Sequence, residues 1–319
     1  MDMIDYSQKA GLVKSPTDYR NVNMTAVLPA AQTIPTFFKP TQTVQNIDQT
    51  IFPYCVACTG SEMESFLHSV LGKEVDFDWQ WLYAQCKLID GLAPGTEGTT
   101  FKAMLTVLKN TGCKPMGIPD TDSATIALYK IAGYVEVNTD IQSLKTAIFN
   151  YGTILMGFIG SNEGWQTAII KPPLPKEVQW GHATRGRGYL DNVIKVQNSW
   201  GLFWGDNGDF YNGEDYPPFE AWAILLTLPA NWEQLIPAPA DKPKFIFSNQ
   251  MGLGNQTSDV LQLQNCLKYI GCMPKEVPSV QNFGTVTKSS VTLYQKRNNI
   301  PSTGFVGVLT LAQLNKDFN

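Results

Sequence analysis

The sequence predicts an α+β domain followed by a small, largely helical domain. Helix-like segments dominate the first part of the chain, and apolar strand-like segments follow them without regular alternation. The proline-rich stretch PAPADKP then separates these segments from a second set of helices. Helices that precede strands favour an α+β arrangement over an alternating parallel sheet. The 319 residues suit one large domain with a small one attached.

Residues 1–47 are rich in Thr, Asn, Gln and Pro and show little periodicity. We therefore expect an extended N-terminal lead-in with room for one short edge strand. The acidic start MDMIDYSQKAGLVKS lacks the basic end and the apolar run of a secretion signal. We expect the protein to be in the cytoplasm of the producing cell first, and to reach a cell wall or virion by a route that needs no signal.

Three helices are predicted next, and each ends at a glycine. The first runs from about Cys55 to Leu71, and the others cover DWQWLYAQCKLIDG and TTFKAMLTVLKNTG. A glycine-rich loop, GLAPGTEG, lies between the second and the third. The strand-like half starts at YVEVN, contains the helix DIQSLKTAIFNYG, and continues with the apolar strands TILMGFIG, VIKVQNSWG and AWAILLTL.

Composition excludes several classes of function. The net charge of −4 and the pI near 5.3 give no support to binding of nucleic acid or anionic membranes. No run of about 18 apolar residues exists, so we expect no membrane span. The six cysteines do not form the dense framework of a small secreted scaffold, and most are expected to be buried thiols. A bridge between Cys266 and Cys272 stays open.

The stretch DQTIFPYCVACTG places Cys55 and Cys58 three residues apart. A metal site would need further Cys or His ligands at suitable spacing, and the chain has no second close pair of cysteines. A thioredoxin-type redox motif would need a βαβ context, which the predicted elements do not supply. We therefore expect no metal and no cofactor, and we interpret Cys58 as a packed neighbour of Cys55.

Cys55 opens a predicted helix, where the helix dipole favours the thiolate, which is the nucleophilic form of the side chain. A neighbouring imidazolium lowers the pKa of a thiol further. The chain has two histidines. We interpret His68, which lies among apolar positions of the Cys55 helix, as structural, so His182 is the candidate partner. Asn198 can orient the His182 ring by accepting its N–H, and Trp200 can keep water from that hydrogen bond.

Together, DQTIFPYCVACTG, GHATRG and VQNSWGLFWGDNGDFY resemble the papain-like (C1 family) cysteine peptidases. The order of Cys, Gly-His-Ala, Asn-Ser-Trp-Gly and Trp-Gly-x-x-Gly is the order in that family, and the likeness spans roughly residues 25–228. The resemblance implies a two-lobed fold over residues 48–230, with a helical lobe and a β-rich lobe. It also implies a cysteine endopeptidase whose substrates are peptides or proteins.

The resemblance assigns a role to each candidate site residue. Cys55 would be the nucleophile, and His182 would hold an ion pair with it and protonate the leaving amine. Asn198 would orient His182, and Trp200 would shield that contact. Gln49, six residues before Cys55, would supply an oxyanion donor. Three further residues are candidates for the substrate cleft: Tyr54, Gly98 and Gly181.

The sequence departs from the family pattern in two places. Phe52, Pro53 and Tyr54 stand where family members usually have small residues, which leaves open a narrowed cleft, a changed specificity or a degenerate enzyme. The lead-in is also too short and too unpatterned to be the usual long helical pro-region. The rival hypothesis is therefore a non-catalytic structural or binding protein of a virion or cell envelope that retains the peptidase fold.

Residues 231–247 are predicted to be a proline-rich linker, and residues 248–319 a small three-helix domain. The first helix of that domain, SDVLQLQNCLKYIG, has Ser258 or Asp259 as its expected N-cap, and the others lie in KSSVTLYQKRNN and VLTLAQLNK. Four apolar residues fall on one face of the first helix: Val260, Leu263, Leu267 and Ile270.

The patterns Val-x-x-Leu-Gln, Phe-Gly-x-x-Thr and Tyr-Gln in this region resemble the type 1 peptidoglycan-binding domain. The resemblance implies bacterial peptidoglycan as a partner, with Tyr294 and Gln295 as candidates for the wall-binding surface. Both resemblances together imply a cysteine peptidase held at the bacterial cell wall. The lack of a signal makes a bacteriophage origin attractive, as an endolysin or a virion-associated enzyme. Peptidoglycan peptides and proteins both stay open as substrates.

Overall fold

The computed structural model of the protein describes residues 4–18, 20–28, 32–42, 44, 46–230, 242–274 and 277–319. The chain divides into two compact units. Unit 1 comprises Met1–Ser15 and Val22–Leu235, and unit 2 comprises Pro16–Asn21 and Ile236–Asn319. Residues 231–241 of the predicted linker lie outside the described residues.

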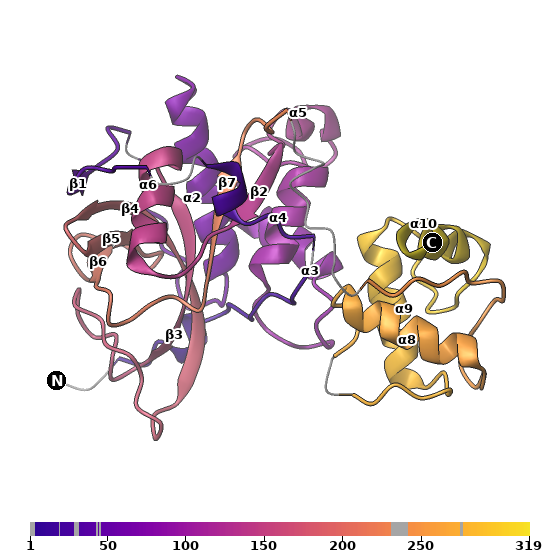
Figure 1. Ribbon diagram of the computed structural model, residues 1–319. Coiled ribbons are helices and arrows are strands. Elements are labelled where there is room, and N and C mark those ends of the chain that lie inside the picture. Colours follow the sequence, from indigo (N-terminus) through magenta and orange to yellow (C-terminus); the bar gives the residue numbers. More distant parts are fainter. Residues whose placement is uncertain are drawn as a thin grey trace. The chain divides into compact units, whose positions relative to one another are not determined.

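Unit 1 has a helical part and a β-rich part. The helices are η1 (Ser7–Lys9), α1 (Met24–Val27), α2 (Cys55–Val70), α3 (Trp79–Ile89), α4 (Phe101–Asn110), α5 (Ser123–Ala127) and α6 (Ile141–Tyr151). The strands are β1 (Phe37–Phe38), β2 (Gly133–Glu136), β3 (Ile154–Ser161), β4 (Gln179–Leu190), β5 (Val193–Gln197), β6 (Asp209–Asn212) and β7 (Glu220–Leu225). Helix α2 contacts α3 and α4 on one side and β4 on the other (Figure 1).

The strands pair antiparallel in the order β2-β7-β3-β4-β5-β6, and β1 pairs with β4 outside this path. Helices on one side and an antiparallel sheet on the other make this the α+β arrangement that the sequence predicts. The predicted helices of the first half correspond to α2, α3 and α4. Asp78 and Thr100 cap α3 and α4, because their side chains accept hydrogen bonds from backbone N–H groups in the first turn.

The sequence does not predict β4, the strand that carries His182. Its segment, QWGHATRGRGYL, holds three glycines and two arginines, which weaken the signal of a strand. It forms a strand because β3 and β5 supply backbone hydrogen bonds along its two edges. The lack of a side chain at Gly186 lets the Met156 side chain pack directly against β4. A Cβ at Gly186 would lie only 2.8 Å from the sulfur of Met156.

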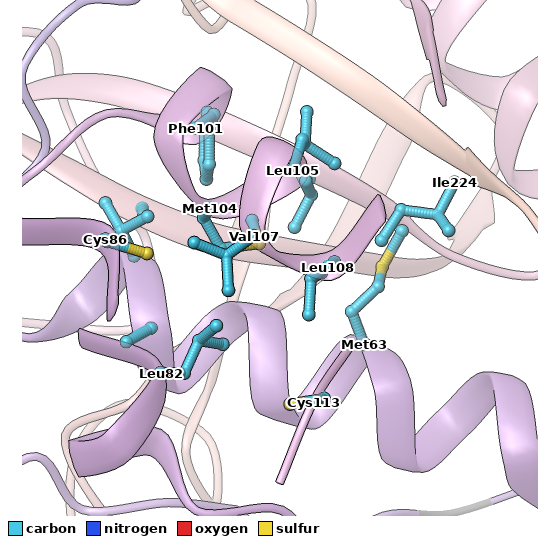
Figure 2. Close-up of a cluster of buried hydrophobic side chains, with 14 of the residues drawn as sticks. Met63, Leu82, Cys86, Phe101, Met104, Leu105, Val107, Leu108, Cys113 and Ile224 are labelled. Carbon is cyan, nitrogen blue, oxygen red and sulfur yellow. The ribbon is translucent and has the colours of Figure 1, made fainter. Parts of the chain in front are cut away.

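An apolar core between α2, α3 and α4 holds the helical part together. Figure 2 shows buried side chains from these helices pointing toward one another, among them Met63, Leu82, Met104 and Leu108. A Cβ at Gly60 would lie 2.8 Å from the sulfur of Met104, so this glycine lets α2 and α4 approach closely. All six cysteines are free and buried, as expected for most of them, and Cys266 and Cys272 form no bridge.

Unit 2 contains α8 (Ser258–Tyr269), α9 (Thr285–Arg297) and α10 (Val308–Phe318). The apolar face predicted for α8 is buried in the core of this unit. The expected N-cap was wrong by one residue: Thr257 caps α8 by accepting the N–H of Val260. Helix α9 begins at Thr285, ahead of the predicted KSSVTLYQKRNN. Among the helices of the described ranges, none combines the length and the apolar character needed to cross a membrane.

We expect Leu82→Ala to lower the free energy of unfolding of unit 1 by about 2–5 kcal/mol, because it removes a buried side chain and leaves a cavity. Urea denaturation followed by circular dichroism measures this change. Leu88→Ala is the matched control, since Leu88 lies on the same helix and is 62% exposed. Equal stability of the two variants would contradict the packing of α3 against this core.

Candidate active site

Cys55 is the first residue of α2, and its side chain is fully buried. The Thr59 hydroxyl, one turn later, donates a hydrogen bond of 3.1 Å to the carbonyl of Ala183 on β4. The backbone N–H groups of Ala183 and Gly11 lie near enough to the Cys55 thiol to favour its anion and so to lower its pKa. Because Ala183 follows His182 directly, this contact brings the thiol to the histidine-bearing stretch of β4.

His182 and Asn198 meet because β4 and β5 are paired, with Arg185 opposite Gln197. The Asn198 Oδ1 lies 2.7 Å from His182 Nε2 and accepts the backbone N–H of Ser199 at 2.8 Å. An atom that accepts a backbone N–H is the amide oxygen, so Nε2 carries the ring proton and donates to it. The other ring nitrogen, Nδ1, is buried and has no hydrogen-bond partner among the described residues. It is therefore free to accept a proton.

Aromatic rings surround the imidazole of His182. The ring of Trp200 is centred 4.7 Å from it, and those of Trp165 and Trp180 lie at 5.6 and 6.2 Å. All three indoles are buried, so they exclude water from the bond between His182 and Asn198. The sequence predicts this role only for Trp200. Trp180 could have been found by its place two residues before His182, whereas no motif marks Trp165.

Gln49 is buried beside the Asn198 segment. Its Oε1 accepts the hydroxyl of Ser199 at 2.5 Å, and its backbone N–H donates to the Ser199 carbonyl at 2.9 Å. The side-chain Nε2 donates to two backbone carbonyls, those of Lys9 and Phe52, each at 2.6 Å. The donor that the sequence assigns to an oxyanion is therefore already bonded to a carbonyl of the lead-in.

Part of the lead-in lies between Gly98 and Gly181, the two glycines predicted to line the cleft. We call the space that it fills between them the groove. Leu12 donates its N–H to the carbonyl of Gly181 at 3.0 Å and pairs with Thr99 as a parallel bridge. A Cβ at Gly98 would lie 2.1 Å from the Gly11 carbonyl oxygen, and one at Gly181 would lie 2.0 Å from that of Leu12. Both glycines are needed for this close approach of the chain.

The same segment fills the groove with side chains. The ring of Tyr6 stacks on Trp200 at 4.3 Å with an angle of 8° between the planes. The Leu12 side chain is buried in the core cluster that contains Phe101 and Ala183. A Cβ at Gly157 would lie 2.6 Å from a methyl carbon of Leu12, so β3 forms a wall of this apolar pocket.

The bulky residues before Cys55 do not fill the groove themselves. The ring of Phe52 is 46% exposed and stacks at 5.3 Å on Tyr54, which also contacts Tyr83 at 4.2 Å. The carbonyl oxygen of Pro53 lies against Gly11 of the lead-in. A Cβ added to Gly11 would lie only 2.0 Å from that oxygen. Pro53 therefore contacts the lead-in directly, whereas the rings of Phe52 and Tyr54 pack against each other and Tyr83.

Burial sets the protonation states of the candidate pair. It raises the pKa of Cys55 to about 11, against the effect of the nearby backbone amides. Burial also lowers the pKa of His182 to about 4, although the bond to Asn198 acts in the opposite direction. At neutral pH the two side chains are a neutral thiol and a neutral imidazole. Burial thus disfavours both charged forms in this covered state, and the ion pair that the resemblance implies stays a prediction.

The described residues contain no group of three or more His, Cys, Asp or Glu side chains that could hold a metal ion. Cys58 lies in the buried face of α2, and burial raises its pKa well above the ordinary value, so it behaves as a packed apolar neighbour. His68 is buried on the same helix and lies 3.6 Å from the carboxylate of Glu64.

The two wall-binding candidates of unit 2 have interior roles. Tyr294 is buried, and its hydroxyl bonds to Asp317 at 2.7 Å. Gln295 is also buried, and its amide bonds to the backbone of Gly304 and Phe305 and to the hydroxyl of Thr310. The expectation that these two side chains present polar groups to a glycan is wrong, because unit 2 uses those groups to join α9, α10 and the loop between them.

Comparisons with known proteins identify the fold. Residues 256–314 match the family described as putative peptidoglycan binding domain. No curated protein sequence matches the chain. Xylellain, a cysteine protease from Xylella fastidiosa, is similar with 20% identity and a TM-score of 0.61, over 70% of this chain and 97% of xylellain.

Two protease precursors are similar as well. Procathepsin B from Trypanosoma congolense has 14% identity and a TM-score of 0.56, over 70% of this chain and 88% of its own. Procathepsin L 3 from Tenebrio molitor has 14% identity and a TM-score of 0.55, over 69% and 77%. The chain therefore has a papain-like fold, as its sequence predicts, with a peptidoglycan-binding type of domain near its C-terminus.

We expect Gly11→Val to expel the lead-in from the groove, since no side chain fits between Gly11 and Pro53. Alkylation of Cys55 by iodoacetamide at pH 7, followed by mass spectrometry, should then accelerate by about 10²-fold or more, as the thiol pKa falls toward its ordinary value. Gly284→Val is the control, because a Cβ there meets open space. An unchanged rate would show that the lead-in does not protect the thiol.

We expect Gln295→Ala to destabilise unit 2 by about 1–3 kcal/mol, because it leaves buried groups unpaired. Thermal unfolding followed by circular dichroism measures this change. Gln281→Ala, at an exposed position, is the control. Loss of peptidoglycan binding by Gln295→Ala without any loss of stability would restore this residue to the wall-binding surface.

Proposed function

We propose that this chain is a cysteine peptidase that acts by a Cys-His-Asn mechanism. One observation carries the proposal: the amide of Asn198 fixes His182 through Nε2 at 2.7 Å and leaves Nδ1 unpartnered, on the strand that meets the Cys55 thiol. Cys55 opens a helix, where a thiolate is favoured once water reaches it. The papain-like fold supports the same assignment.

In the proposed reaction, the proton of the Cys55 thiol moves to Nδ1 of His182, and the sulfur forms a bond to the substrate carbonyl carbon. The Nε2 donor of Gln49 and the backbone N–H of Cys55 stabilise the resulting oxyanion. The carbon–nitrogen bond then breaks as His182 returns the proton to the leaving amine. Water hydrolyses the thioester and regenerates the thiol.

The proposed enzyme is latent as long as its lead-in stays in the groove. The Lys9 carbonyl occupies the donor of Gln49, and Leu12 uses the carbonyl of Gly181. A peptide that replaced the lead-in would find the same backbone groups, and the pocket of Leu12 would accept an apolar side chain of similar size. A substrate can therefore enter only after residues 6–13 leave the groove. Hydrogen bonds and packing hold these residues in place, and they do not form the long helix of the usual pro-region.

The match of residues 256–314 supports targeting to bacterial peptidoglycan. Tethering raises the local concentration of a wall-linked substrate without changing the active site. A phage lytic enzyme or a virion-associated enzyme fits this combination, with peptidoglycan peptides or envelope proteins as substrates. We further propose that residues 48–230 form the peptidase domain and that residues 248–319 form the wall-binding domain.

A degenerate structural or binding protein is the second candidate function. The aromatic residues Phe52 and Tyr54 and the covered, neutral thiol favour it. The two functions differ in whether Cys55 becomes a nucleophile once the lead-in has left. A peptidyl epoxide that needs an activated thiolate should label Cys55 but not Cys58 in Gly11→Val if the chain is a peptidase. Failure to label the exposed thiol would favour the degenerate protein.

In the Gly11→Val background we expect hydrolysis of protein or cell-wall substrate, measured by a casein assay beside zymography on bacterial walls. Adding Cys55→Ala should abolish it, because the nucleophile is lost. Adding Gln49→Ala should reduce it by about 10²–10³-fold, because one oxyanion donor is lost. Turnover by the Cys55→Ala chain at the rate seen with Cys55 present would refute the mechanism. Hydrolysis in the casein assay would indicate a protein substrate, and hydrolysis in zymography a cell-wall substrate.

A further inference from the structure

A cavity of about 410 Å³ lies in unit 1 where β1, β4, β5 and β6 are paired side by side (Figure 1). Among the described residues that line it, none is a candidate residue of the active site. Its volume falls in the range of about 300–1,000 Å³ that small-molecule sites occupy in proteins. The cavity is therefore a candidate binding site that the proposed peptidase reaction does not use.

Much of the cavity wall is apolar and open to solvent. Phe37 of β1 pairs with Leu190 of β4, and Leu190 pairs with Val193 of β5. Directly paired residues point to the same face of a sheet, so these three side chains form one apolar surface. They are 58%, 58% and 42% exposed, in that order, whereas Phe66 of α2 lines the cavity from the buried side. An apolar ligand that covered this surface would remove it from water.

The rest of the wall carries positive charge. Four cationic side chains line the cavity: Lys39, Arg185, Arg187 and Lys195. Asp209 forms ion pairs with both Arg187 and Lys195, and Asp206 forms another with Lys195 at 3.5 Å. Lys39 and Asp191 carry opposite charges at exposed positions of the lining. The cation that these acidic residues leave unmatched is Arg185.

Arg185 is buried without an ion pair in the described part of the chain. It is 2% exposed, and its guanidinium donates to two neutral acceptors, the side-chain oxygen of Gln197 and the hydroxyl of Thr153. Glu62 attracts it without lying at ion-pair distance. The Nε–H groups of Arg185 and Arg187 are both buried, and no described residue accepts them. Buried donors without an acceptor are costly, so an anion that accepted them would be stabilised here.

We propose that this cavity binds a small apolar carboxylate. Its carboxylate accepts the free N–H groups of Arg185 and Arg187, and its apolar body lies on the surface formed by Phe37, Leu190 and Val193. A planar carboxylate matches the geometry of a guanidinium, and a single negative charge matches the one cation left unpaired. At roughly 30 Å³ for each non-hydrogen atom, the cavity has room for about 14 of them, the size of an arylalkanoic or medium-chain fatty acid.

The binding test uses the full chain and isothermal titration calorimetry at pH 7, with 4-phenylbutanoate as the probe. We expect a Kd on the order of 0.1 mM for a ligand of this size. The neutral 4-phenylbutanamide keeps the shape, and acetate keeps the charge. Each should bind about tenfold more weakly or less, because it lacks one of the two interactions. Equal affinity for either of them, or no binding of 4-phenylbutanoate at about 10 mM, would overturn the proposal.

Two variants test the two parts of the cavity. Arg185→Gln removes the unpaired charge and should weaken 4-phenylbutanoate about tenfold or more, with little effect on the amide. Val193→Glu places a carboxylate at the exposed apolar surface and should weaken it to a similar extent. Leu128→Glu is the matched control, since Leu128 is 75% exposed and does not line the cavity.

The melting temperature of each variant shows whether it is folded. Val193→Glu decides the question if Arg185→Gln does not fold, because the side chain of Val193 is exposed. Unchanged affinity of folded Val193→Glu for 4-phenylbutanoate would contradict the assigned site. So would a loss of binding in Leu128→Glu as large as the loss in Val193→Glu.

Cross-linking tests the location directly. A diazirine-bearing analogue of 4-phenylbutanoate, followed by mass spectrometry of the peptides, should label residues 37–42 or 187–195. Excess 4-phenylbutanoate should suppress this labelling. Labelling confined to other segments would overturn the proposal. None of these measurements needs hydrolysis of a substrate, so their outcome is independent of the proposed peptidase function.

Discussion

The pairing of β4 with β5 is the constraint on which the rest of the site depends. It places His182 beside Asn198, and the 2.7 Å bond between them fixes which ring nitrogen keeps the proton. The hydroxyl of Thr59 then holds α2 against β4, so that the first residue of the helix, Cys55, meets the same strand. Because each contact is short and buried, a shift of one strand by a single register would separate all three side chains.

Exclusion of water has two opposite effects in this protein. Around His182 the indoles protect a hydrogen bond that solvent would weaken, which favours an ordered site. Over Cys55 the lead-in removes the solvent that a thiolate needs, so the thiol keeps its proton. Burial also raises the pKa of Glu62, to about 7. The order of the His182–Asn198 pair and the access of solvent or substrate to Cys55 are therefore separate properties. The lead-in controls the access.

Much of the fold and the candidate site could be predicted from the sequence. Helical periodicity and caps located α2, α3, α4 and α8, and the motif order brought Cys55, His182, Asn198 and Gln49 into one hypothesis. Strand β4 escaped prediction, because its glycines and arginines gain strand structure only from neighbours on both edges. Tyr294 and Gln295 were misplaced on a binding surface, because a polar residue gives no sign in sequence of whether its partner is a ligand or the protein itself.

The sequence by itself determined which chemical groups the protein has and the order in which the chain presents them: a thiol at a helix start, one histidine outside that helix, and an asparagine at a strand end. Only the tertiary structure decided what surrounds those groups. The lead-in lacks periodicity, yet Leu12 and Tyr6 fit a groove built from Gly98, Gly181 and Trp200. Burial depends on residues distant in sequence, and burial sets the pKa of Cys55 and of Glu62.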